Sequence, residues 1–117
     1  MDLCGWQIRE AGQMLYRIHG LILRRDWDTL RTLAVMAQDM PEDILFELND
    51  YPGEMTDCTE QEFCDELLIY DWDAVSQMHV GAPLWFDGEP GDLSMECEVV
   101  FDGRAVKRVT LCGVHVF

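Results

Sequence analysis

The stretch LSMECEVVF, residues 93–101, decides the fold class of this chain. Its apolar side chains alternate with Ser94, Glu96 and Glu98, which is the period of a strand with one buried and one wet face. Asp102-Gly103 follows directly and has the composition of a two-residue hairpin turn. Such a turn would pair Glu98 with Lys107, a favourable match of opposite charges across the strands. The pattern therefore predicts an antiparallel hairpin.

Strand composition extends on both sides of this hairpin. Three upstream runs are rich in aromatic and β-branched residues, which favours strands: Leu67–Trp72, Val75–Val80 and Pro83–Phe86. A tight polar loop, residues 87–92, separates the last run from residues 93–101. Further strand structure is expected from Ala105 to the C-terminus, so an antiparallel sheet is predicted over about 67–117.

The first half of the chain has helical periodicity instead. One stripe of residues 6–24 is apolar, which predicts an amphipathic helix. Gly12 and Gly20 interrupt it, so one of them is expected to permit close packing or to end the helix early. A second helix is expected from the N-cap residue Asp26 through Ala37, and a third from Pro41 to about Asn49.

A capping box predicts further helical turns before the sheet. Thr59 and Glu62 have its spacing, and Phe63 supplies an apolar residue directly afterwards. With 117 residues and 49% hydrophobic content, the chain is long and apolar enough to form one domain over 1–117. Its helical part covers about 3–66 and its sheet part about 67–117. The order predicts an α+β fold with N-terminal helices packed on one face of a curved antiparallel sheet.

The order of these segments also resembles a known fold family. A short helix beginning DWDTL (26–30), then a meander through LWF (84–86), DLSM (92–95) and VHV (114–116), is similar to small bacterial domains of the cystatin-like cone fold, of the nuclear-transport-factor-2-like type. The resemblance implies a curved sheet around a pocket. Because that fold hosts both enzymes and binding proteins, it implies no single function.

The charge of the chain is large and segregated. The formal net charge is −15, and the 72 positions between Arg31 and Arg104 hold 19 acidic residues and no Lys or Arg. Such a field opposes direct contact with nucleic acid or an anionic membrane. It favours a basic protein as the partner.

The third predicted helix carries part of this negative charge on one of its sides. Asp43, Glu47 and Asp50 share one side at i, i+4 and i+7, and Phe46 flanks them. Acidic residues continue into the polar middle of the chain. The predicted partner-binding residues are Asp43, Phe46, Glu47, Asp50, Tyr51, Glu54, Asp57, Glu60 and Glu62.

Size, charge and the lack of a catalytic motif resemble the immunity proteins of bacterial toxin-immunity pairs, including those of contact-dependent growth inhibition and other polymorphic toxins. The resemblance implies a cytoplasmic protein that binds and neutralises a basic toxin, such as a nuclease domain. Two alternatives stay open. One is a phage-type inhibitor of a nucleic-acid-binding host complex, and the other is a cone-fold enzyme or small-ligand binder with a pocket lined by Trp72, Trp85 and His79.

No catalytic residue, metal or cofactor is predicted. The carboxylates of Asp87, Glu89 and Asp92 lack the spacing of a calcium-binding loop. A cone-fold enzyme would place a histidine near an acid such as Asp71 or Asp73, but with three histidines in the chain such a placement is expected by chance and does not favour that chemistry.

The five cysteines form no C-x-x-C pair, which indicates reduced thiols in a cytosolic protein. Charges spread through residues 2–25 argue against a signal peptide or membrane span, and a monomer is favoured.

Overall fold

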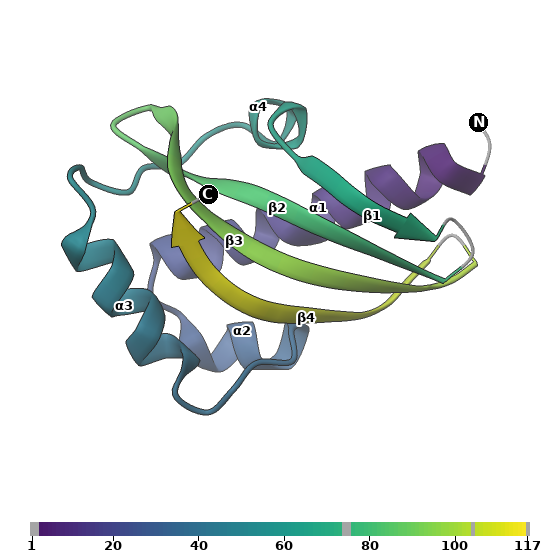
Figure 1. Ribbon diagram of the computed structural model, residues 1–117, viewed down its shortest axis with the longest axis horizontal. Helices are drawn as coiled ribbons and strands as arrows, with labels where there is room; N and C mark the ends of the chain where they lie inside the picture. Colours follow the sequence, from purple (N-terminus) through teal and green to yellow (C-terminus); the bar gives the residue numbers. More distant parts are fainter. Residues whose placement is uncertain (1–2, 74–75, 104, 117) are drawn as a thin grey trace.

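The computed structural model describes residues 3–73, 76–103 and 105–116, without the side chains of Leu3, Cys4, Trp72 and Asp73. Four helices come first: α1 (Leu3–Leu23), α2 (Trp27–Leu33), α3 (Met40–Asp50) and α4 (Glu60–Asp65). Four strands follow: β1 (Leu68–Asp73), β2 (Gln77–Phe86), β3 (Glu89–Asp102) and β4 (Ala105–Val116). They pair antiparallel in chain order to give an open sheet, so the predicted α+β class is confirmed (Figure 1).

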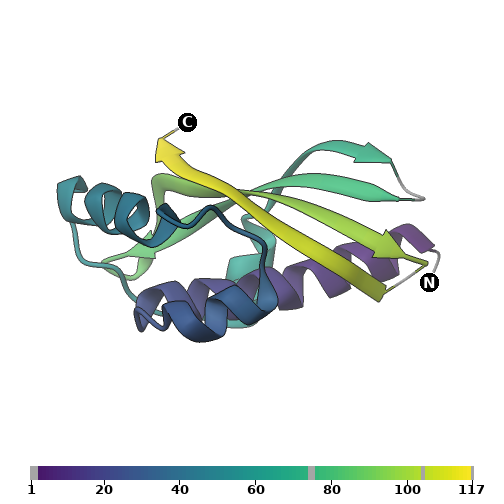
Figure 2. The ribbon, with the colours of Figure 1, turned by 90° about the horizontal axis from the view of Figure 1, so that it is seen from below.

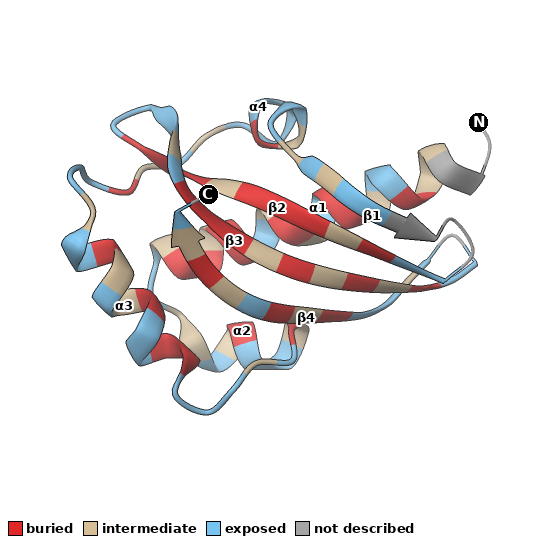
Figure 3. Cartoon of the chain, in the orientation of Figure 1, coloured by how far each residue is buried: buried red, intermediate tan, exposed pale blue. Residues whose placement is uncertain are grey.

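Helices α1 and α2 lie along one face of the twisted sheet, and the core fills the space between them (Figure 2). The predicted alternation in β3 is confirmed, because Leu93, Met95, Cys97, Val99 and Phe101 are all buried (Figure 3). Opposite them, the predicted apolar stripe of α1 is buried at Ala11, Leu15, Ile18, Leu21 and Ile22. The apolar side of α1, which follows the helical period, thus faces the apolar side of β3, which follows the two-residue period of a strand.

Gly12 permits the close packing that the sequence predicts for a glycine in α1. A Cβ atom at this position would lie 2.7 Å from Cys64 Sγ on α4, which is closer than two such atoms approach. The absence of a side chain at Gly12 therefore lets α4 rest against α1.

Helix α2 is shorter than predicted. Asp26 caps its N-terminus, since its side chain accepts a hydrogen bond from the Thr29 amide, but the helix ends at Leu33 instead of Ala37. The next residues are extended, and Val35 donates to the carbonyl of Val109 and accepts from the amide of Leu111, both at 2.8 Å. This parallel bridge to the edge of β4 replaces the last helical turn.

The sheet has fewer strand breaks than predicted. Strand β2 runs unbroken to Phe86, where two strands were expected, and Val75 lies outside the described residues. The turn after Phe86 is only Asp87-Gly88, both with positive φ, so residues 89–92 belong to β3 and not to a loop. A residue pair in that conformation matches the twist of a hairpin and needs no longer connection.

The predicted register of the last hairpin is wrong. Asp102 pairs with Ala105, so the connection begins at Gly103, and Arg104 lies outside the described residues. Glu98 lies opposite Thr110 and not Lys107. The predicted register would have set buried Cys97 opposite Arg108. In the structure the later turn and an irregularity between Val100 and Phe101 bring Cys97 opposite Leu111, and a second irregularity between Glu96 and Cys97 brings Met95 opposite Val114. Together they keep apolar side chains on the core face.

The four described cysteine side chains, Cys58, Cys64, Cys97 and Cys112, are all free thiols. Among the described helices, none combines the length and apolar character needed to cross a membrane.

Candidate partner-binding site

Helix α3 presents the predicted acidic face. Pro41 lies in its first turn, where a missing N–H leaves no hydrogen bond unmade. Ile44 and Leu48 are buried, whereas Asp43 and Asp50 are exposed. Phe46 is 69% exposed, which leaves a large aromatic ring in contact with water beside the carboxylates. The predicted division of this helix into an apolar and an acidic side is confirmed.

The acidic face forms one wall of a groove. Helix α3 packs beside β4 (Figure 1), and two hollows of about 280 and 260 Å³ lie in series along the contact, with Glu47 lining both. We call this feature the α3 groove. Its lining residues are Met40, Asp43, Phe46, Glu47, Asp50, Tyr51 and Pro52 on one side, and Asp92, Leu93, Cys112, Gly113, Val114, His115 and Val116 on the other.

The α3 groove carries negative charge without a balancing Lys or Arg. Four of its lining residues are carboxylates: Asp43, Glu47, Asp50 and Asp92. The imidazole of His115 is the one basic group in the lining, and it lies 3.1 Å from the carboxylate of Glu96 on β3. A cationic side chain would therefore enter a region of negative potential.

Tyr51 lines one of the two hollows of the α3 groove. Its hydroxyl accepts a hydrogen bond from the Asp92 amide at 2.9 Å, and its ring lies 4.1 Å from that of Phe86, centroid to centroid. A Cβ atom at Gly91 would lie 2.9 Å from that hydroxyl, so this approach needs glycine. Tyr51, predicted as a partner contact, is half-buried, and its hydroxyl links the C-terminal end of α3 to β3.

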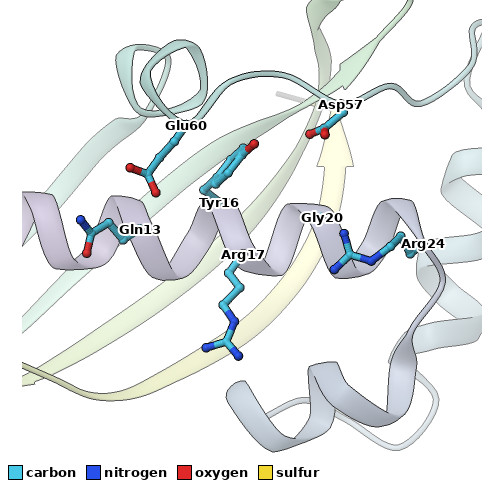
Figure 4. A pocket seen from close by; sticks show the side chains of 7 residues that line it. All are labelled: Gln13, Tyr16, Arg17, Gly20, Arg24, Asp57 and Glu60. Atoms are coloured by element: carbon cyan, nitrogen blue, oxygen red, sulfur yellow. The ribbon is translucent and has the colours of Figure 1, made fainter.

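The other predicted partner-binding residues lie away from α3. Asp57 and Glu60 line a separate hollow of about 420 Å³ together with Arg17 and Arg24 of α1 (Figure 4). Two carboxylates and two guanidinium groups leave this hollow with no net charge. This hollow therefore lacks the excess of carboxylates that lines the α3 groove.

Glu62 and Glu54 also have local partners. The Glu62 carboxylate accepts from the Thr59 amide at 2.9 Å, while the Thr59 hydroxyl accepts from the Glu62 amide, so the predicted capping box is confirmed. The Thr59 amide and hydroxyl lower the pKa of Glu62. The backbone of Glu54 is hydrogen-bonded to Asp87, the Glu54 amide donating to the Asp87 carboxylate.

A buried histidine lies beneath the segment that carries Asp57. The His19 side chain is fully buried, and its Nε2 accepts a hydrogen bond from the Trp85 amide at 3.2 Å. Burial lowers the pKa of His19 to about 4. The imidazole is therefore neutral at pH 7, with its proton on Nδ1.

His19, Asp57 and Cys58 bring three potential metal ligands within 4.8 Å of one another. Two of them have the wrong protonation for that role. The bond from Trp85 places a proton on Nδ1 of His19, and burial raises the pKa of the Cys58 thiol to about 11. Metal binding needs an unprotonated nitrogen and a thiolate, so a metal ion here would have to displace both of these protons.

The sheet face opposite α1 and α2 carries a second polar cluster. His79 on β2 lies 3.0 Å from the carboxylate of Glu98 and 3.7 Å from that of Asp71. An irregularity in the pairing of β1 falls between Ile69 and Asp71, beside Tyr70. His79 thus has the acid neighbour expected of a cone-fold enzyme, but the side chain of that neighbour, Asp71, is 74% exposed.

The predicted pocket lined by Trp72, Trp85 and His79 does not form around the last two. They are six residues apart on β2, about 20 Å along an extended strand, and Trp85 is buried against His19. The side chain of Trp72 lies outside the described residues.

Sequence reasoning missed the second wall of the α3 groove. The sequence pattern places Asp92 in an acidic loop and residues 112–116 in the last strand, and it does not place either beside the third predicted helix. The lateral contact of α3 with the sheet edge brings together residues about 40 to 75 positions apart, and no local pattern signals it.

No curated protein and no solved structure matches the chain. A family model does match, from Gly20 within α1 through the last strand. Since the match covers most of the chain, the protein belongs to the family described as Domain of unknown function (DUF7668), at residues 20–117.

Proposed function

We propose that this protein binds a basic partner protein at the α3 groove and neutralises it, as the immunity proteins of bacterial toxin systems do. The observation that carries the proposal is the set of four unbalanced carboxylates beside the exposed ring of Phe46. The family match carries no activity, so the proposal rests on this surface. The expected partner is a toxin, with a nuclease domain as the favoured kind.

The two parts of the surface have separate roles in binding. The net charge of −15 and the groove carboxylates accelerate encounter with a positively charged protein and make the association rate fall as salt rises. The Phe46 ring supplies apolar area of the kind that dominates affinity once a complex has formed. A phage-type inhibitor of a nucleic-acid-binding complex would use the same surface, so only the partner distinguishes the two roles.

The first test is charge reversal in the groove. The triple variant Asp43→Lys, Glu47→Lys and Asp50→Lys should lower the association rate about tenfold or more, because it replaces attraction by repulsion. The toxin candidate is the product of the reading frame immediately upstream of the gene. The measurements are its association rate with the purified protein and the growth of cells that express both proteins.

A matched control keeps the same change in total charge. Glu66, Glu89 and Asp102 are exposed and lie outside the groove lining, so their reversal to Lys should lower the association rate much less. Equal loss in both variants would mean that only total charge matters and that the groove is not the site. Failure of the wild-type protein to bind or protect would contradict the immunity role.

The variant Phe46→Ala should weaken the affinity for the partner without changing the electrostatic steering of association. The ring is exposed, so its removal leaves the charge unchanged and should raise the dissociation constant about tenfold or more, through the dissociation rate. Surface plasmon resonance resolves the two rates. An unchanged dissociation rate would remove Phe46 from the binding surface.

A further inference from the structure

We infer that the α3 groove takes an extended basic segment of its partner, with alternate side chains entering the two hollows. This inference rests on the proposed function, since it specifies what part of a basic partner occupies the site. It predicts recognition of a strand-like segment instead of a broad folded surface.

The spacing of the groove matches an extended chain. Asp43 and Glu47 are four residues apart on α3, hence about 6 Å along the helix axis. Alternate side chains of an extended segment recur about every 6.6 Å on one side. The spacing of alternate side chains in a segment lying along β4 would therefore be close to the spacing of the helix carboxylates, and Glu47 lines both hollows.

The edge of β4 already accepts an extended segment elsewhere. Upstream of the groove, Val35 forms two backbone hydrogen bonds with Val109 and Leu111 of β4. Further along the same strand, α3 lies beside β4 (Figure 1). The two hollows lie between α3 and a wall that includes residues 112–116. A partner segment in the groove would continue along the line of the extended segment around Val35.

The residues that line the α3 groove determine which side chains of a partner segment fit it. The α3 wall supplies Asp43, Glu47 and Asp50, which suits Lys or Arg on the side of the segment that faces the hollows. The mouth of the groove has exposed apolar side chains at Phe46 and Val116, which are 69% and 60% exposed. The matching segment therefore alternates basic with apolar residues.

Two capped pentapeptides of one composition test the inference. One alternates three lysines with two valines, and its isomer holds the three lysines consecutively between the valines. Backbone amide shifts of the isotope-labelled full chain, at low ionic strength, report both affinity and location. We expect the alternating peptide to bind about fivefold more tightly and to shift amides of residues 43–50 and 112–116. Glu47→Gln should weaken that binding about threefold, and Glu66→Gln should leave it unchanged.

The outcomes separate this inference from the proposed function. Equal binding of the two peptides would mean that charge alone is read, and shifts elsewhere would place the segment on another surface. Either result overturns the extended-segment inference, and so does the absence of peptide binding. If the triple lysine variant still loses protection in such a case, the proposed function stands and a folded basic surface is the occupant. If that variant protects as well as the wild type, the proposed function itself fails.

Discussion

Replacing Phe63 by alanine should lower the free energy of unfolding by about 3–5 kcal/mol. The ring is 1% exposed and is the buried residue of α4, where it lies 5.7 Å from the ring of Tyr16 and 5.3 Å from that of His19, centroid to centroid. A cavity at this point removes the contact that holds the six residues of α4 on α1. Urea unfolding followed by circular dichroism measures the loss.

Phe46→Ala is the matched control, because the same atoms are removed from a ring that is 69% exposed. Its free energy of unfolding should change by less than about 0.5 kcal/mol. The two phenylalanines thus separate stability from binding: one variant unfolds easily, and the other folds normally but binds its partner poorly. Similar stability losses in both variants would show that the packing around Phe63 has been misassigned.

Lowering the pH from 7 to 5 should cost about 2 kcal/mol of unfolding free energy through His19. The pKa of this histidine is lowered to about 4 by burial, from 6.5 in an unfolded chain. Between these two values the unfolded state binds a proton that the folded state does not. Stability from this group is therefore present above pH 6.5 and is lost as the pH falls toward 4.

His19→Gln isolates the effect. Glutamine retains an oxygen that can accept the bond from the Trp85 amide, but it does not titrate. The many carboxylates of the chain titrate in both proteins, so the difference between their pH profiles belongs to His19. Denaturant unfolding at pH 7, 6 and 5 gives both profiles. Parallel profiles would contradict the assignment of a neutral, buried imidazole.

Local patterns in the sequence suffice for most elements of the fold. Alternation marks β3, the apolar stripe marks α1, and the pairing of Thr59 with Glu62 marks the start of α4. The register of the last hairpin could not be predicted, since Asp102-Gly103 and the Glu98–Lys107 charge pair both favour a turn one residue early. The structure instead has a turn one residue later and an irregularity between Val100 and Phe101, which together set buried Cys97 opposite Leu111. This register depends on packing across the sheet and not on a local pattern.

The candidate site was predictable to the extent that it lies on one helix. Asp43, Glu47 and Asp50 recur with the helical period, so their common face follows from the sequence alone. Asp57 and Glu60 are also acidic but line a hollow together with Arg17 and Arg24 of α1, and no local signal predicts that these distant segments lie together. The acidic residues of the sequence therefore lie on two surfaces: the α3 groove, which is negatively charged, and the hollow beside Arg17 and Arg24, which has no net charge.

The bridge between Val35 and Thr110 bears on the order in which the molecule assembles. These residues are 75 positions apart, and β4 is the last strand of the chain. During synthesis the helical half leaves the ribosome long before the strand that pairs with Val35 exists. Because closure of so long a loop is slow, the connection between α2 and α3 should acquire its final shape only after translation reaches β4. Until then, the apolar stripe of α1 lacks the complete sheet that covers it in the folded protein.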